Sequence, residues 1–144
     1  MPVIIFFILD ASAVVDWLLP DGGNSSDITQ LLLSPTSNLI VPHLWHTEVR
    51  HALLGLLRRK AISRAQFDKC IRKLNSLDVQ TDMRTASEWT LELVEKHSLS
   101  IYDAVYLELV MEKAKSNSVS LATLDKALVR AAKAEGIPLV CQKD

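Results

Sequence analysis

Glycine and cysteine are scarce in this sequence, and the motifs built on them are absent. Only 4 of the 144 residues are glycine. Neither a P-loop nor a GxGxxG fingerprint occurs, so nucleotide binding through those motifs is excluded. The 2 cysteines, Cys70 and Cys141, form no CxxC pair and no disulfide framework. Their spacing favours a reducing, cytoplasmic setting.

The chain also lacks an excess of charge of either sign and a long hydrophobic run. It carries 16 Lys and Arg residues and 17 Asp and Glu residues, for a net charge of -1. A nucleic-acid partner would therefore require a local basic patch or a metal rather than bulk charge. The apolar stretch from Val3 to Leu9 is far shorter than the roughly 20 residues that span a membrane, and it lacks the basic segment of a signal peptide. We expect a buried strand there, with neither export nor a membrane span.

Hydrophobic residues make up 49% of the chain, and short apolar runs alternate with amphipathic segments. The patterns predict strands at 3–9, 39–41, around Val79, 119–122 and 137–141, and helices at 12–19, 25–33, 43–60, 63–77, 85–97, 101–115 and 124–135. We expect a turn at 21–24 and Gly136 as the C-cap of the last helix. The alternation implies a single α/β domain over residues 1–144, with a parallel sheet covered by helices on both faces.

Four carboxylates fall at places where this fold would bring them together. Asp10 directly follows the first strand, and Asp125 follows the strand that ends at Ala122, so both lie at carboxyl ends of strands, where ligands bind in open parallel sheets. Asp103 shares an apolar helix face with Tyr106, and Glu48 lies at the edge of an apolar stripe. Buried carboxylates require a partner. Oxygen ligands without a nearby cysteine suit Mg²⁺ or Mn²⁺.

Each acid also has a purely structural interpretation. Asp10 would cap the helix that follows it, and either Asp125 or Thr123 would cap the last helix. Ser100 and Asp103 fit a capping box. Glu48 would pair with a neighbouring arginine. The functional interpretation gains from the joint placement of the four acids, because unpaired carboxylates repel one another and favour a bound cation.

Other patterns are weaker. His43 and His46 share a helix face but lack a third metal ligand, so a surface pair is expected. A basic run on two consecutive helices is either a solvated face or a track for a phosphate backbone; it comprises Arg58, Arg59, Lys60, Arg64, Lys69, Arg72 and Lys73. Apolar residues flanking the presumed site would suit a partner helix; they are Trp17, Leu18 and Trp45.

Four segments around these acids resemble the PIN-domain ribonucleases, in particular the VapC-type toxins of bacterial toxin–antitoxin pairs. The segments occur in the order of that family, at residues 8–15, 48–53, 102–107 and 121–128. The resemblance covers essentially the whole chain. It implies a PIN-like three-layer α/β/α sandwich with a five-stranded parallel sheet, a homodimer, and an antitoxin that blocks the site. It places the metal-site acids at Asp10, Glu48, Asp103 and Asp125, with hydroxyl partners at Ser12 and Thr123.

The expected function is metal-dependent hydrolysis of RNA. Asp10 and Asp103 would hold Mg²⁺ or Mn²⁺, Asp125 would complete the site or bind a second ion, and Glu48 would ligate or activate the attacking water. One alternative is a catalytically idle PIN-like module that only binds a partner. Another is a receiver-like phosphoryl-transfer domain, which would require adjacent acids after the first strand, where Asp10 stands alone.

Overall fold

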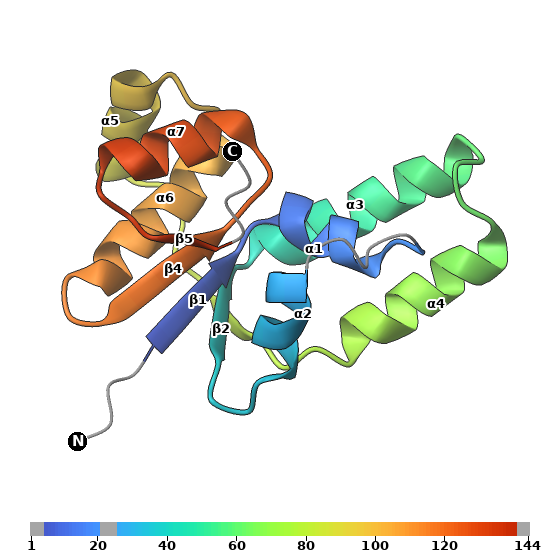
Figure 1. Ribbon diagram of the computed structural model, residues 1–144. Coiled ribbons are helices and arrows are strands. Elements are labelled where there is room, and N and C mark those ends of the chain that lie inside the picture. Colours follow the sequence, from blue (N-terminus) through green and yellow to red (C-terminus); the bar gives the residue numbers. More distant parts are fainter. Residues whose placement is uncertain (1–4, 21–25, 141–144) are drawn as a thin grey trace.

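Five parallel strands form the centre of the protein (Figure 1). The computed structural model describes residues 5–20 and 26–140. The strands are β1 (Ile5–Leu9), β2 (Asn38–Pro42), β3 (Gln80–Asp82), β4 (Ser118–Ala122) and β5 (Leu139–Val140), in the spatial order β3-β2-β1-β4-β5. The predicted α/β fold with a five-stranded parallel sheet is confirmed.

The first strand lies in the middle of the sheet. It pairs with β2 from Phe6 to Ile8 and with β4 along its whole length, Ile5–Leu9. Ile8 and Leu9 have no exposed surface. The continuous apolar run of the sequence is therefore the signature of a strand that is covered on both faces.

Seven helices cover the described part of this sheet. They are α1 (Ala11–Leu18), α2 (Ser26–Leu33), α3 (Leu44–Arg58), α4 (Arg64–Asn75), α5 (Glu88–His97), α6 (Ile101–Ala114) and α7 (Lys126–Ala134). Figure 1 shows α5, α6 and α7 on one side of the sheet and α1 to α4 on the other. The hairpin formed by α3 and α4 projects away from the body of the protein.

Several predicted boundaries move, and capping accounts for those at the starts of α4 and α5. Ser63 and Ser87 form capping boxes, so α4 and α5 begin one residue after each serine, and the predicted helical start at Thr85 is wrong. The strand expected around Val79 begins at Gln80 instead, and β5 begins at Leu139 rather than 137. Gly136 follows α7 with a φ of 72°, the left-handed geometry that glycine tolerates at a helix end.

Some sequence-based predictions fall outside the described residues. These are the outer part of the first strand, the turn at 21–24 and the end of the last strand at Cys141. Within the described ranges, no helix is both long enough and apolar enough to cross a bilayer.

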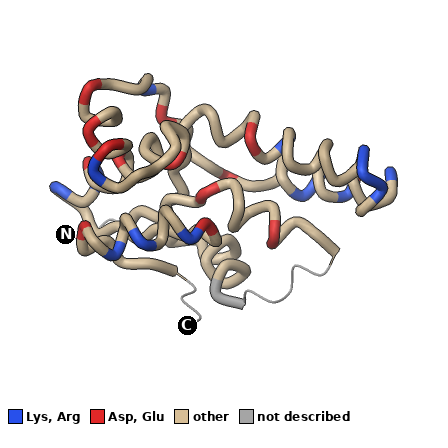
Figure 2. The backbone as a smooth tube through the Cα atoms, turned by 90° about the horizontal axis from the view of Figure 1, so that it is seen from above, with Lys and Arg blue, Asp and Glu red and all other residues tan. Residues whose placement is uncertain are grey.

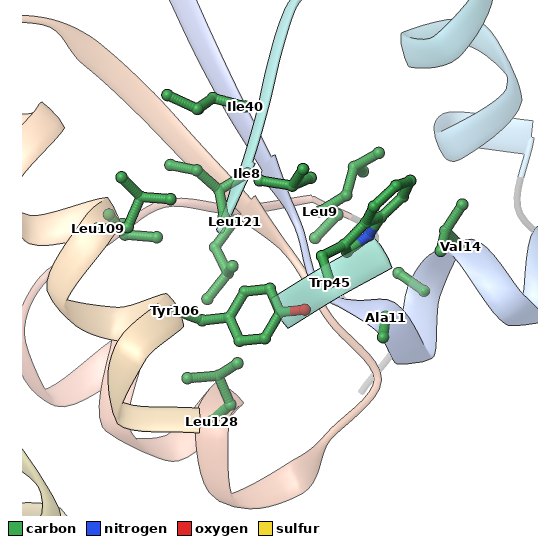
Figure 3. Close-up of a cluster of buried hydrophobic side chains, with 14 of the residues drawn as sticks. Ile8, Leu9, Ala11, Val14, Ile40, Trp45, Tyr106, Leu109, Leu121 and Leu128 are labelled. Atoms are coloured by element: carbon green, nitrogen blue, oxygen red, sulfur yellow. The ribbon is translucent and has the colours of Figure 1, made fainter. Parts of the chain in front are cut away.

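The core lies where the sheet meets the helices, and it includes the aromatic side chains of Trp45 and Tyr106 (Figure 3). Trp45 is 1% exposed and Tyr106 is fully buried. Trp17 and Leu18 are also buried, at 7% and 4% exposure. The prediction that Trp17, Leu18 and Trp45 present an apolar surface to a partner helix is therefore wrong, because their own domain uses these side chains for packing.

Candidate functional site

The carboxyl ends of β1 and β4 lie side by side, and the residues that follow them meet directly. The Asp10 amide donates a hydrogen bond to the Ala122 carbonyl at 2.9 Å, which extends the ladder by one residue. Asp10 is thereby placed next to Thr123, although 113 residues separate the two in sequence. The pairing of β1 with β4 thus forms the edge of the sheet at which the site was predicted.

Both hydroxyls predicted near the site donate to the same oxygen of Asp10. Ser12 Oγ and Thr123 Oγ1 each lie 2.7 Å from Asp10 Oδ2. Asp10 occupies the N-cap position of α1, but its side chain makes no capping hydrogen bond. The helix-cap interpretation of this carboxylate is therefore wrong. With Oδ2 serving both hydroxyls, Oδ1 is left without a hydroxyl donor.

The same two hydroxyls connect the loops that follow β1 and β4. Ser12 Oγ accepts from the Leu124 amide at 3.0 Å, and Thr123 Oγ1 accepts from the Asp125 amide at 3.0 Å. Each hydroxyl therefore donates a hydrogen bond to Asp10 and accepts one from a backbone amide in the loop that follows β4. This network fixes the position of Asp10 relative to the start of α7.

Glu48 is held by a buried tyrosine rather than by an arginine. Tyr106 donates its phenolic hydrogen to Glu48 Oε1 at 2.8 Å. No ion pair to Glu48 occurs within the described ranges, so the predicted pairing with arginine is not found. The bond joins α3 to α6 across 58 residues.

Asp103 and Asp125 both lie at helix starts, with different roles there. Asp125 Oδ1 caps α7 by accepting from the Leu128 amide at 2.9 Å. Ser100 caps α6 by accepting from the Asp103 amide at 3.1 Å, which leaves the Asp103 carboxylate half-buried rather than engaged as a cap. The capping interpretation thus holds for Asp125, whose second oxygen remains available.

The four acids form one electrostatic cluster. Burial, then the charges of Asp125 and Asp10, raise the pKa of Asp103 to about 6, and Glu48 adds to the effect. Burial also raises the pKa of Asp10, against the opposing hydrogen bonds of Ser12 and Thr123. The pKa of Glu48 is raised by burial and by the charge of Asp10. No Lys, Arg or His of the described residues forms an ion pair with any of the four.

This cluster is suited to a cation, although its side chains are not drawn together around one. In the described part of the chain, no three His, Cys, Asp or Glu side chains are close enough to hold a single ion. Separation is the arrangement expected of like charges without a counterion. The donors are carboxylate oxygens, which Mg²⁺ and Mn²⁺ prefer. Close approach of Asp10, Asp103 and Asp125 around a metal stays a prediction.

His43, the N-cap of α3, and His46 in its first turn do not form a competing site. His46 Nε2 lies 2.9 Å from Thr81 Oγ1, while His43 is exposed. Their arrangement agrees with the expected surface pair.

Tyr106 is the residue that the sequence did not identify as part of this site. Its position three residues after Asp103 on the same helix face was the available signal. We expect Tyr106→Phe to lower the free energy of unfolding by about 1 kcal/mol, because a buried hydrogen bond to Glu48 is lost while the ring still fills its place. Urea denaturation measures this change.

Tyr102→Phe is the matched control for that substitution. Tyr102 lies in the first turn of the same helix with a side chain 59% exposed, so removal of its hydroxyl should leave the stability unchanged. Equal effects of the two substitutions would contradict a specific contribution of the Tyr106 hydrogen bond.

Comparison with known structures places the fold among solved proteins. A protein of Pyrobaculum aerophilum, PAE2754, superposes with a TM-score of 0.65 at 22% identity, covering 94% of this chain and 83% of that one. VapBC2 from Rickettsia felis, solved bound to a DNA fragment from its promoter, superposes with a TM-score of 0.58 at 14% identity. The match covers 93% of this chain and 96% of that one. A domain of a functionally unknown protein from Methanocaldococcus jannaschii superposes with a TM-score of 0.53 at 20% identity, covering 96% of this chain and 91% of that one.

A search of curated protein sequences gave no match. The sequence profile of the PIN domain, however, matches residues 7–134, a range that includes the four acids and both hydroxyls. That range covers the seven helices and four of the five strands of the described residues; it begins within β1 and ends before β5. The chain therefore belongs to the PIN-domain family.

Proposed function

We propose that this protein is a metal-dependent endoribonuclease and that Asp10, Glu48, Asp103 and Asp125 form its active site. The observation that carries the proposal is the group of four interacting carboxylates without a cationic partner in the described residues. Asp10 and Asp125 follow β1 and β4, and Glu48 and Asp103 come from α3 and α6. The PIN family consists mostly of metal-dependent nucleases. An acidic cluster alone repels a phosphodiester, so a cation between the two is required.

Each acid has a distinct task in this proposal. Asp10, through the oxygen free of hydroxyls, and Asp103 would hold Mg²⁺ or Mn²⁺, and the free oxygen of Asp125 would complete the site or hold a second ion. A divalent cation supplies charge to offset the phosphate and lowers the pKa of a bound water. Ser12 and Thr123 keep Asp10 in place by their hydrogen bonds.

Glu48 is the residue best placed to accept a proton from the attacking water. Its raised pKa makes it a stronger base than an ordinary glutamate. The hydrogen bond from Tyr106 engages Oε1 and orients the carboxylate, so that Oε2 is free to face a water.

The proposal extends to the partners of the protein. The VapBC2 neighbour supports the role of a toxin that is paired with an antitoxin. That this toxin acts as a homodimer is proposed from the family resemblance alone. The antitoxin would place a basic side chain, preferably arginine, against the acids, since a guanidinium supplies the charge that a metal otherwise provides. Co-purified complex should then be inactive and the free chain active; equal cleavage rates would contradict this partner role.

Metal-dependent cleavage separates this function from its rivals. The purified chain should cut single-stranded RNA with Mg²⁺ or Mn²⁺ and stop when EDTA is added. Unpaired RNA is the expected substrate because its backbone can bend into a shallow site. Binding of RNA without cleavage under any metal would favour the idle binding module, and transfer from a small phosphodonor to Asp10 would favour the receiver-like domain.

Metal binding can also be measured without a substrate. Mn²⁺ at about 100 times its dissociation constant should stabilise the fold by about 2.7 kcal/mol, because only the folded chain brings the four acids together. A thermal melt with and without Mn²⁺ gives the shift. Mn²⁺ that leaves the melting temperature unchanged would contradict a metal site.

A further inference from the structure

The charges of this nearly neutral chain are distributed very unevenly. Residues 58–73 contain seven of the 16 Lys and Arg residues and one of the 17 acids, so this segment carries +6 and the rest of the chain -7. Figure 2 shows basic residues at the far end of the α3–α4 hairpin and along it, whereas most of the acidic residues lie on the rest of the protein. The hairpin is therefore a basic arm on an acidic body.

Not all of the basic side chains on this arm are free to bind a partner. Lys73 donates to the Trp17 carbonyl at 3.2 Å and lies 3.7 Å from the centre of the Trp17 ring. Arg64 pairs with Asp68 at 3.2 Å. The corner where α3 ends, at Arg58, Arg59 and Lys60, is exposed and forms no ion pair in the described ranges.

This corner is connected to the acidic site by one face of α3. Glu48, Ala52, Gly55 and Arg59 follow one another at spacings of four, three and four residues, which places them in a single row. The row spans 11 residues, about 16 Å at 1.5 Å per residue. Arg59 lies back over Gly55, since its Nη1 is 3.5 Å from the point where a Cβ would be. Its guanidinium is thus directed along the row toward Glu48.

The row lies on the side of α3 that faces away from α4; Glu48, Ala52 and Gly55 in it are half-buried, and Arg59 is exposed. Arg50 lies about 160° around the helix from Glu48. It donates to Asn75 of α4 at 3.0 Å, which identifies the side that the hairpin covers. Small residues, Ala52 and Gly55, occupy the middle of the row, so backbone atoms of a ligand can approach the helix closely.

Building on the proposed nuclease function, we propose that Arg58, Arg59 and Lys60 bind the phosphate backbone of the RNA substrate and hold the strand along this row as it enters the acidic site. Exposed guanidinium and ammonium groups at a helix corner suit successive phosphates. A stacked strand, at roughly 3.4 Å per nucleotide, would cover the row with about five nucleotides. The surface is therefore expected to distinguish long RNA from very short RNA.

Binding in EDTA tests this surface without any cleavage. A labelled 20-nucleotide oligouridylate should bind the triple variant Arg58→Gln, Arg59→Gln, Lys60→Gln at least tenfold more weakly than the unaltered protein at low salt. The slope of log affinity against log salt should fall by about 2, at roughly 0.7 for each phosphate that the variant no longer neutralises. Fluorescence anisotropy between about 50 and 200 mM KCl measures both quantities.

The matched control removes the same charge elsewhere. Lys115 directly follows α6, and Arg130 and Lys133 lie on α7; all three are exposed. Their triple change to glutamine should alter RNA affinity less than twofold. Equal weakening by both triple variants would overturn the proposal. The proposal would also be overturned if the Arg58, Arg59 and Lys60 triple variant bound RNA normally but no longer bound polyglutamate. That result would indicate that the corner binds an acidic protein.

Lys60 allows a second test, in which RNA binding weakens although the stability of the fold does not fall. Lys60 has a φ of 60°, the left-handed conformation that glycine adopts without strain. Lys60→Gly should leave the melting temperature unchanged or higher while RNA binding weakens. Unweakened binding in this folded variant would overturn the contribution of Lys60.

Substrate length separates this inference from the proposed function. With Mn²⁺, the unaltered protein should cleave the 20-mer much faster than a trinucleotide, and the basic triple variant should lose that preference while cleaving the trinucleotide normally. If the unaltered protein cleaves neither RNA, the nuclease function fails, whereas the binding measurements still decide on the basic corner. A length preference retained by the triple variant would overturn the inference.

Discussion

Asp10→Asn should leave a folded protein whose RNA cleavage is at least a thousandfold slower. Both hydroxyls that hold Asp10 donate to one oxygen, and an amide oxygen accepts the same two hydrogen bonds. The amide nitrogen then takes the place of the oxygen assigned to the metal, where a donor repels a cation. Loss of a ligand to a catalytic metal raises the barrier by several kcal/mol, and about 4 kcal/mol corresponds to a thousandfold.

Stability measurements make the result for Asp10 interpretable. The substitution removes a buried negative charge from an acidic cluster, so the melting temperature without metal should be unchanged or higher. Asp16→Asn, on the same helix, is the matched control and should keep full activity. Full cleavage by the folded Asp10→Asn protein would refute the assignment of Asp10 as a metal ligand.

Asp103→Asn should combine an equally large loss of cleavage with a gain in metal-free stability that depends on pH. The pKa of Asp103 in the folded chain is about 6, against 3.8 for an ordinary aspartate. The folded state therefore holds the Asp103 proton more tightly than the unfolded state does. This proton binding stabilises the fold at low pH, and the stabilisation is lost as the pH rises from about 4 to 6. At pH 7.5 asparagine removes the repulsion between Asp103 and the other acids. The free energy of unfolding should rise by about 1 kcal/mol, a modest gain because the side chain is only half-buried.

Melts of the two proteins at two pH values check this sign. At pH 4, where Asp103 is largely protonated, the variant and the unaltered protein should melt together; at pH 7.5, without metal, the variant should melt higher. Mn²⁺ should reverse the order, since only the unaltered protein has the full ligand set. A variant that is less stable than the unaltered protein at pH 7.5 in EDTA would contradict the acidic cluster.

The sequence predicted the fold and the neighbourhood of the acids because both depend on local patterns. A continuous apolar run indicates a buried parallel strand, and Asp10 follows such a run directly. In a parallel sheet the carboxyl ends of adjacent strands share an edge, so Asp10 and Asp125 were expected near each other. The pairing of β1 with β4 realises this expectation.

Side-chain direction is the part that local pattern does not determine. Asp10 and Asp125 both precede a helix, yet only Asp125 caps one, because the two hydroxyls draw Asp10 away. The bond between Tyr106 and Glu48 joins residues 58 apart, and it depends on how α3 and α6 pack. The surface role expected for Trp45 failed for the same reason: a residue on the apolar stripe of α3 was already required by the core.

The strand order has a consequence for the synthesis of this protein on the ribosome. The central strand β1 emerges first, but its longest ladder is with β4, more than 100 residues later. Domains fold as units while the chain elongates at about 5–20 residues per second. The nascent chain therefore spends its synthesis without the Ala122 backbone and Thr123 that hold Asp10 in place. A chain that cuts RNA would thus acquire its activity only when translation of its own domain is nearly complete.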